Sequence, residues 1–200
     1  MLFKPGKITY ISNLKLKKKF DTLINKLETK NILDFGVGTN KLYKIIHYNK
    51  YFIYDINANF SNYHNKKDDI IILKDYKKIK DHIDIIFFNS VIQYIDLIEL
   101  ESILLHLSKT INITILINDI PNYNRCLEFF LILLKNFRYA FLIYKNIFDN
   151  IFIKKSLSHK FYFHNKQTLI DLCIKLGFKV SINKNYYINN CRYTLILKKI

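Results

Sequence analysis

Short apolar segments that alternate with helical patterns constrain the fold of this chain more than any other feature. Each segment is only four to seven residues long and nearly continuous in apolar character, which favours strands over helices. Strands of this kind are typical of a parallel sheet that is covered on both faces. The expected strands are Asn31–Phe35, Tyr51–Asp55, Ile70–Leu73, Asp84–Asn89, Ile113–Asn118, Phe178–Asn183 and Arg192–Lys198.

Helical patterns fill most of the gaps between these strands. The spacing of apolar residues predicts helices over Lys41–His47, Ile98–Leu107 and Lys166–Leu176, and Gly177 is a natural C-cap for the last one. Only the short polar connection "NKNYYINNC" separates the final two strands, which predicts an antiparallel hairpin at one sheet edge. We therefore expect an α/β fold, a three-layer α/β/α sandwich with a mostly parallel seven-stranded sheet and a C-terminal antiparallel hairpin.

The length favours one domain over residues 1–200, with two additions to the sheet. Leu14–Leu27 has the apolar spacing of an amphipathic helix, so residues 1–30 are expected to form an N-terminal helical extension. Residues 122–160 are longer than a simple connection requires and contain the apolar run "LEFFLILLKNFRYAFLIYKNIF". We expect a helical insertion or lid there. A dimer face and an interfacial, peripheral membrane contact are the alternatives.

The formal net charge of +16 raises the question of a nucleic-acid or membrane partner. Lysine outnumbers arginine 29 to 3, although arginine is the residue suited to bidentate recognition of bases and phosphates. Lysine, asparagine and isoleucine also share A/T-rich codons, so genome composition explains much of the excess. We favour solvated lysine faces and keep nucleic acid as the alternative. The start of the chain does not resemble a signal peptide, no apolar run is long enough to span a membrane, and the cysteines have no metal-binding spacing, so we expect a cytoplasmic chain without a metal.

The stretch "ILDFGVGTN" places two glycines directly after the first expected strand. Gly36 and Gly38 would let the backbone approach a ligand closely, and the following helix offers its unpaired N–H groups. Asp55 ends the second strand 19 residues after Gly36, close to the distance expected for an acid that binds ribose hydroxyls. Lys41 occupies the third glycine position of the dinucleotide fingerprint, which argues against NAD or FAD.

Two later strand ends add polar residues at the same edge of the sheet. Asp75 follows the third strand, where its carboxylate could accept an adenine amino hydrogen, and Tyr76 could flank the ring. Asn89 ends the fourth strand, in "DIIFFNSVIQYI". Asp84, at the other end of that strand, is expected to be structural.

In this order, the motifs resemble those of the class I S-adenosylmethionine-dependent methyltransferases. The first motif of that family, L-D-x-G-x-G-x-G, is matched by Leu33, Asp34, Gly36 and Gly38, with Asn40 in place of the last glycine. Asparagine tolerates left-handed backbone geometry, so the substitution is compatible with the loop. The resemblance implies that S-adenosylmethionine is the cofactor, held by Asp34, Gly36, Gly38, Asn40, Asp55, Asp75, Tyr76 and Asn89.

The resemblance also implies methyl transfer, and we expect a small-molecule acceptor such as a sugar, a lipid-linked intermediate or a metabolite. Candidates for a catalytic residue are His159, Tyr162 and His164, which lie in "SLSHKFYFHNK" before the last helix. One alternative is an RNA methyltransferase, although the Asn/Asp-Pro-Pro-aromatic motif of amino-group methylases is absent after the fourth strand. The other is a non-catalytic binding or scaffold protein, which the substitution at Asn40 motivates. The sequence does not specify the oligomeric state.

Overall fold

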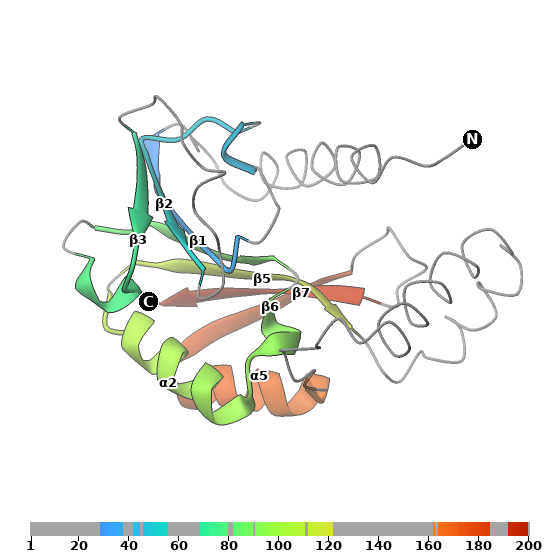
Figure 1. Cartoon of the computed structure of the whole chain (residues 1–200). Helices are drawn as coiled ribbons and strands as arrows, with labels where there is room; N and C mark the ends of the chain where they lie inside the picture. The colour runs from blue at the N-terminus through green and yellow to red at the C-terminus, as the bar shows by residue number, and fades with distance from the viewer. Residues whose placement is uncertain are drawn as a thin grey trace, which may run out of the picture.

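The computed structural model contains one seven-stranded sheet, with the strand order β3-β2-β1-β4-β5-β7-β6 (Figure 1). The structure describes residues 29–37, 42–44, 46–55, 69–79, 82–89, 91–110, 112–121, 162, 164–184 and 192–199. The strands are β1 Asn31–Phe35, β2 Lys50–Tyr54, β3 Ile70–Leu73, β4 Ile85–Asn89, β5 Thr114–Pro121, β6 Phe178–Lys184 and β7 Arg192–Lys199.

Strands β1 to β5 are parallel to one another, whereas β7 runs antiparallel to both β5 and β6. The predicted mixed sheet with a closing C-terminal hairpin is therefore confirmed. All seven strands lie within three residues of their expected bounds, and the largest difference is the extension of β5 to Pro121.

Two α-helices have clear start and stop signals. Helix α2, Leu97–Leu107, is capped at its N-terminus by Asp96, whose carboxylate accepts a hydrogen bond from the Glu99 N–H at 2.7 Å. Helix α5, Lys166–Lys175, begins at Asn165 and is followed by Gly177, whose φ of +78° is the left-handed geometry of a helix end. The other helical elements within the described ranges are the 3₁₀ turns η2 Leu42–Lys44, η4 Tyr76–Lys78 and η5 Ile92–Tyr94.

The helix predicted over Lys41–His47 is replaced, among the described residues, by the three-residue turn η2. The sequence continues as Ile-Ile-His-Tyr-Asn, and these β-branched, aromatic and polar residues have low helix propensity. Leu42 and Tyr43 are adjacent in sequence and are both buried, which a 3₁₀ turn beside the sheet permits.

Side chains that alternate along the strands form a core on each face of the sheet. On one face, residues such as Leu33, Phe52 and Phe88 join a cluster that includes the apolar stripes of α2 and α5. Both helices lie on this face (Figure 1). On the opposite face, Ile53 and Phe87 belong to a second cluster with Leu42 and Tyr43. Burial on both faces agrees with the expected sandwich. The predicted extension over residues 1–30 and the insertion over residues 122–160 lie almost entirely outside the described residues.

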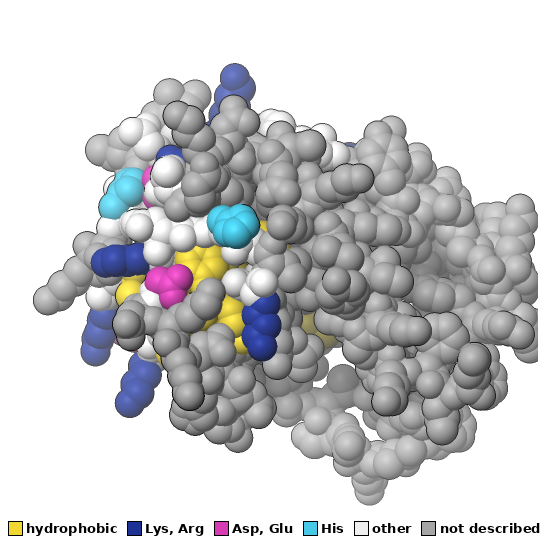
Figure 2. Space-filling model, turned by 90° about the horizontal axis from the view of Figure 1, so that it is seen from above, with side chains coloured by type: hydrophobic (Ala, Val, Ile, Leu, Met, Phe, Trp, Pro, Cys, Tyr) yellow, Lys and Arg dark blue, Asp and Glu magenta, His cyan; other side chains and the backbone are white. Residues whose placement is uncertain are grey.

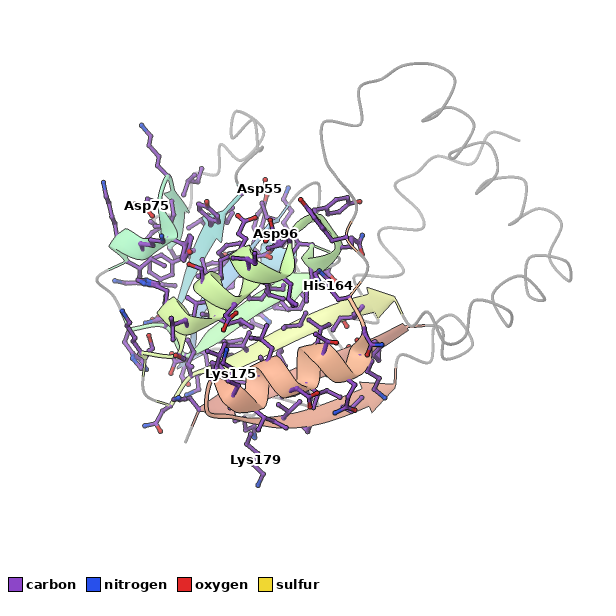
Figure 3. All side chains as sticks on the ribbon, turned by 90° about the horizontal axis from the view of Figure 1, so that it is seen from below. Asp55, Asp75, Asp96, His164, Lys175 and Lys179 are labelled. Atoms are coloured by element: carbon purple, nitrogen blue, oxygen red, sulfur yellow. The ribbon has the colours of Figure 1, made fainter. Side chains whose placement is uncertain are left out.

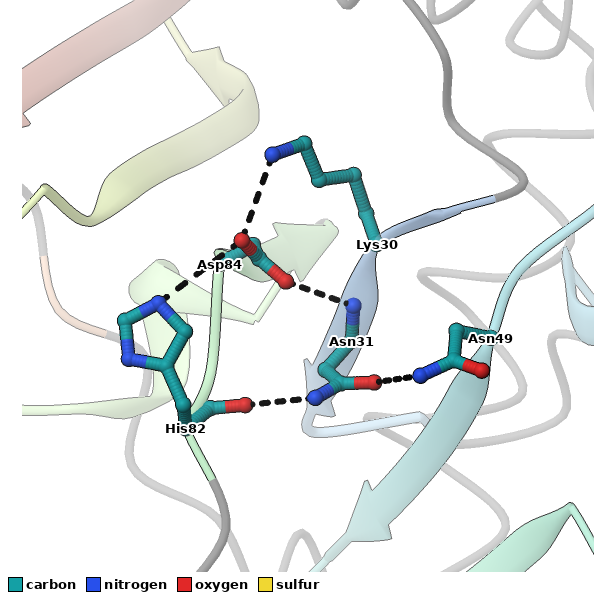
Figure 4. A network of polar contacts seen from close by, with 5 residues as sticks. All are labelled: Lys30, Asn31, Asn49, His82 and Asp84. Carbon is teal, nitrogen blue, oxygen red and sulfur yellow. Dashed lines mark hydrogen bonds and ion pairs between the residues drawn. The ribbon is translucent and has the colours of Figure 1, made fainter.

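The starts of the central strands are joined by a polar network around Asp84 (Figure 4). Its carboxylate accepts hydrogen bonds from the Asn31 N–H at 2.8 Å and from Lys30 Nζ at 3.3 Å, and His82 Nε2 lies 3.7 Å away. The Asn31 side chain donates to the His82 carbonyl and accepts from Asn49 Nδ2, both at 2.8 Å. The network links β1, β2 and β4 at the amino edge of the sheet, so Asp84 has the structural role expected from the sequence.

We predict that Asp84→Ala lowers the free energy of unfolding by about 1–3 kcal/mol, because the Asn31 N–H would lose its carboxylate acceptor. The partly exposed ion pair with Lys30 should contribute less than about 1 kcal/mol of this loss. Urea denaturation measures the change, with Asp69→Ala as a control that removes a negative charge without breaking this network. Equal losses in the two variants would contradict the assignment.

Candidate functional site at the carboxyl edge of the sheet

The carboxyl ends of β1 and β4 lie side by side at the point where the chain connections diverge. From β1 the sheet continues to β2 and β3, and from β4 it continues to β5. Such a switch point leaves a crevice at the carboxyl edge of an α/β sheet. Phe35 and Phe88 are register partners, so the next residues, Gly36 and Asn89, follow at the same level on the two sides of this point.

Gly36 turns the chain at the end of β1 with a φ of +76°. Its N–H donates to the Tyr54 carbonyl at 2.7 Å, which fixes the turn to the end of β2. A Cβ at this position would lie 2.3 Å from Val91 Cγ2, a distance that no side chain could tolerate without movement. Glycine is thus required here both by the backbone conformation and by the close approach of the segment after β4.

Asp34 is fully buried on the face of the sheet opposite to α2 and α5. Its Oδ2 accepts a hydrogen bond from the Tyr51 hydroxyl at 2.8 Å, whereas Oδ1 has no hydrogen-bond partner among the described residues. Burial raises the pKa of this carboxyl to about 7, against the opposing effect of Tyr51, and the charge of Asp55 raises it further. The described hydrogen bond of Asp34 therefore joins the end of β1, just before the glycine loop, to Tyr51 on β2.

The two acids expected to bind the nucleoside lie at neighbouring strand ends (Figure 3). Asp55 directly follows β2, is half-buried, and lies near enough to Asp34 to influence its pKa. Asp75 follows β3 and caps η4, because its Oδ1 accepts a hydrogen bond from the Lys77 N–H at 3.0 Å. Strands β1, β2 and β3 thus present Gly36, Asp55 and Asp75 in spatial order along one half of the edge.

Tyr76 belongs to an aromatic cluster that underlies this half of the site. Its ring lies 5.0 Å from that of Phe35 and 5.2 Å from that of Tyr54, both edge-on, and 5.6 Å from that of His106. Burial raises the pKa of the Tyr54 and Tyr76 hydroxyls, which keeps both neutral near pH 7. Only 8% of Tyr76 is exposed, so most of the ring packs against protein, and its expected contact with an adenine ring stays a prediction.

The other half of the edge carries a chain of side-chain hydrogen bonds across β4, β5 and β7. Thr194 Oγ1 donates to Asn118 Oδ1 at 2.6 Å, and Asn118 Nδ2 donates to Asn89 Oδ1 at 2.8 Å. Thr194 and Asn118 are buried, whereas Asn89 is half-buried at the end of its strand. The predicted site residue Asn89 is therefore hydrogen-bonded to Asn118, which is in turn hydrogen-bonded to Thr194. The sequence motifs identified neither of these two residues.

The segment before α5 is attached to the turn after β4. The Tyr162 N–H donates to the Gln93 carbonyl at 2.7 Å, and His164 Nε2 lies 3.0 Å from the Ile92 carbonyl and 2.9 Å from the Ile95 carbonyl. Both carbonyls are acceptors, so Nε2 must carry a hydrogen. His164 is 8% exposed. Two of the three candidate catalytic residues are thus brought to the β4 side, and the described contacts of His164 are structural.

Three sequence-predicted site residues, Gly38, Asn40 and His159, lie outside the described residues, and their roles stay predictions. Within the described ranges, no cluster of three or more histidine, cysteine, aspartate or glutamate side chains could hold a metal ion. In the same part of the chain, no helix combines the length and apolar character needed to cross a membrane.

Sequence reasoning missed Tyr51, Gln93, Asn118 and Thr194. Tyr51 and Thr194 lie within strands that read as ordinary β segments, so their partners became visible only when the strands were paired. Asn118 gave a signal, since it interrupts the apolar run "ITILIND" at the level of the ligand edge. Gln93 gave no such signal, because its burial and the lack of a hydrogen-bond partner for Oε1 among the described residues are visible only in the structure.

Comparison with known proteins identifies the fold. No family model matches the sequence, and no curated protein matches it significantly. The structure is similar to that of a SAM-dependent methyltransferase from Archaeoglobus fulgidus, with a TM-score of 0.59, 15% sequence identity and 94% of both chains covered. It is also similar to magnesium protoporphyrin IX methyltransferase from Synechocystis PCC 6803 with bound SAH, with a TM-score of 0.56, 10% identity and coverage of 100% of this chain and 90% of that one.

A third similar structure is a chain of the Pnkp1/Rnl/Hen1 RNA repair complex, with a TM-score of 0.57 and 13% sequence identity. The match covers 97% of this chain but only 47% of that one. The chain therefore has the class I methyltransferase fold, and the expected fold family is confirmed.

We predict that the stability difference between wild type and Asp34→Asn depends on pH. Because the pKa of Asp34 in the folded protein, about 7, exceeds its ordinary 3.8, the folded state binds the proton more tightly than the unfolded chain. The contribution of Asp34 to the free energy of unfolding of the wild-type protein therefore falls as the pH rises from about 4 to about 7, and it is constant above that range. The variant does not titrate, so its stability relative to wild type should rise by about 2–4 kcal/mol across this window.

Urea denaturation at several pH values measures this difference. Tyr51→Phe removes the hydrogen bond that lowers the Asp34 pKa. The loss of stability with rising pH should therefore extend to a higher pH in this variant than in wild type. A stability difference between wild type and Asp34→Asn that stays constant from pH 4.5 to 8 would show that ionisation of Asp34 does not destabilise the folded protein.

We predict that Gly36→Ala destabilises the protein more than Gly177→Ala. Both glycines have positive φ, which costs about 1–2 kcal/mol for alanine. At Gly177 the new Cβ would meet only the flexible end of Lys199 at 2.8 Å, whereas at Gly36 it would meet Val91. Thermal unfolding compares the two, and Val91→Ala should partly rescue Gly36→Ala. Equal destabilisation by the two alanine substitutions would contradict the close approach.

Proposed function

We propose that this chain binds S-adenosylmethionine at the carboxyl edge of β1–β4 and transfers its methyl group to a small-molecule acceptor. The observation that carries this proposal is the turn at Gly36. It combines left-handed backbone geometry, a contact that excludes a side chain, and a position at the switch point of the sheet beside Asp55. The fold shared with methyltransferases supports the same conclusion.

The described residues fit the parts of this cofactor in order along the edge. The half-buried carboxylate of Asp55 can accept hydrogen bonds from two ribose hydroxyls, which is the contact that its distance from Gly36 suggests. Asp75, one strand further, is the candidate for the adenine amino group. Gly36 turns the backbone at the switch point, with Val91 in the space that its Cβ would occupy. Asp34, Gly38, Asn40 and Tyr76 complete the proposed set.

When bound, S-adenosylmethionine supplies an electrophilic methyl group, which a lone pair of the acceptor takes up as the carbon–sulfur bond breaks. The contribution of this chain is to hold and orient the two partners at the switch point. The Tyr162–His164 segment is fixed to the turn after β4 by three hydrogen bonds, so it forms a stable wall on the side where the acceptor would lie. An acceptor hydroxyl would require a base to remove its proton, and His159 and Tyr162 are the candidates.

A small-molecule acceptor is favoured over RNA by the residues at the site and by the surface. The segment after β4 reads Asn-Ser-Val-Ile-Gln-Tyr and lacks the Pro-Pro-aromatic motif of amino-group nucleic-acid methylases. On the face shown in Figure 2, the described lysine side chains are scattered and do not gather in one patch. Dispersed lysines give weak, salt-sensitive attraction to phosphates and no base recognition.

We predict that wild-type protein binds S-adenosylmethionine in isothermal titration calorimetry and that Asp55→Ala weakens this binding about 10- to 100-fold. A hydrogen bond to a charged group contributes about 1.5–3 kcal/mol, which sets this range. Asp69→Ala, which removes an acid before β3 at the opposite edge, should change the affinity less than twofold. Circular dichroism confirms that each variant is folded.

Unchanged affinity in Asp55→Ala would refute the ribose assignment alone. Absence of binding in folded wild-type protein would contradict the enzymatic function and favour the scaffold interpretation. Retention on RNA that persists at physiological salt would favour an RNA acceptor, whereas retention that disappears there would identify non-specific attraction.

A further inference from the structure

We infer that Thr194 and Asn118 are positioning residues, which hold the Asn89 carboxamide with its NH₂ group toward the proposed cofactor. This inference rests on the proposed function and adds to it a role for the C-terminal hairpin. Neither Thr194 in β7 nor Asn118 in β5 lies in any of the motifs that define the cofactor loop.

The direction of the hydrogen bonds determines what Asn89 presents to a ligand. The Thr194 hydroxyl donates to Asn118 Oδ1, which leaves Asn118 Nδ2 to donate to Asn89 Oδ1. The Asn89 oxygen is thereby used, and its amide nitrogen has no hydrogen-bond partner among the described residues. Because Thr194 is 2% exposed and Asn118 is 8% exposed, water competes little for these bonds. Asn89 is thus oriented as a hydrogen-bond donor at the sheet edge.

A β-bulge gives Asn118 its position in this chain. Ile117 pairs with Leu195 and Ile120 pairs with Tyr193, so β5 has two residues where β7 has only Thr194. Such bulges redirect side chains near functional sites. Asn118 is at the same time the register partner of Asn89 on β4. The bulge therefore brings one side chain within hydrogen-bond distance of both neighbouring strands.

The position of Asn89 indicates which part of the cofactor it would contact. Asp75 after β3 and Asp55 after β2 are the proposed adenine and ribose contacts, so the molecule extends from β3 toward β1 and β4. The methionine part then lies near Gly36 and Asn89, on either side of the switch point. Its carboxylate oxygens are strong hydrogen-bond acceptors and match an amide NH₂ donor.

The opposite orientation of the Asn118 and Asn89 side-chain amides makes a different prediction. If both amides were turned over, Asn118 Nδ2 would donate to Thr194 Oγ1 and Asn89 would present its oxygen to the ligand. An oxygen there would repel a carboxylate and would instead accept a hydrogen bond from the ammonium group of the methionine part. Asn89→Asp distinguishes the two arrangements, because its negative charge weakens binding where the amide NH₂ faces the carboxylate and preserves or strengthens binding where the oxygen faces the ammonium group.

The test is calorimetry of the full chain with S-adenosylhomocysteine, which retains the methionine carboxylate. Thr194→Val keeps the shape and removes the hydroxyl, so we expect binding about 5- to 10-fold weaker, the effect of one hydrogen bond. Thr194→Ser keeps the hydroxyl and should stay within twofold of wild type. Asn89→Asp should bind at least about tenfold more weakly. If Thr194→Val does not fold, Thr194→Ala serves in the same comparison.

A double-mutant cycle separates positioning from a general structural effect. In an Asn89→Ala background, Thr194→Val should cause no further loss of affinity, because there is no amide left to orient. An equal loss in both backgrounds, no loss in Thr194→Val, or wild-type affinity in Asn89→Asp would overturn the positioning role. Absence of binding by the wild-type protein would instead overturn the proposed function and, with it, the cofactor as the ligand.

Discussion

The turn at Gly36 is the constraint on which the site depends. It follows a strand whose last four residues are buried, adopts a φ of +76°, and lies so close to Val91 that a Cβ has no room. Its N–H bond to the Tyr54 carbonyl also fixes the end of β1 to the end of β2. The relative positions of the first, second and fourth strand ends therefore follow from one residue without a side chain. A ligand at this edge would meet a backbone that is already in place.

Polar side chains at the amino edge and at the carboxyl edge of the sheet have different roles. At the amino edge, Asp84 has partners on both oxygens, and its network joins strand starts where no ligand is expected. Buried side-chain atoms without a partner among the described residues occur on the carboxyl side and also at the Tyr48 hydroxyl, close to the start of β2. Asp34 Oδ1 and Gln93 Oε1 are buried without a hydrogen-bond partner among the described residues. Incomplete pairing costs stability and is typical of sites that bind another molecule.

Much of the fold could be predicted because short apolar strands and capped helices are local signals. β1, β3 and the end of β4 were predicted at their observed bounds, and Gly177 ends α5 as expected. The helix over Lys41–His47 was wrong, because apolar spacing was counted there without weighing the low helix propensity of Ile-Ile-His-Tyr-Asn. Spacing alone does not determine whether a short segment forms a helix or a 3₁₀ turn.

The positions of the candidate site residues were predictable where they stand at strand ends, as at Gly36, Asp55 and Asn89. They were not predictable where strand pairing brings distant residues together. The contact between Asn118 and Thr194 spans 76 positions in sequence and depends on a bulge that no local pattern indicates. The attachment of His164 to the turn after β4 likewise depends on tertiary structure.

Chemical-shift mapping with S-adenosylhomocysteine on isotope-labelled protein tests the central claim most directly, because it locates the ligand without requiring an acceptor. We predict that the largest changes occur at the backbone amides of Gly36 and Asp55 and at the side-chain amide of Asn89. The amides of Asn31 and Asp84 at the opposite edge should change little. Changes centred on the Asp84 edge, or none at saturating ligand, would contradict a cofactor site at the carboxyl edge of the sheet.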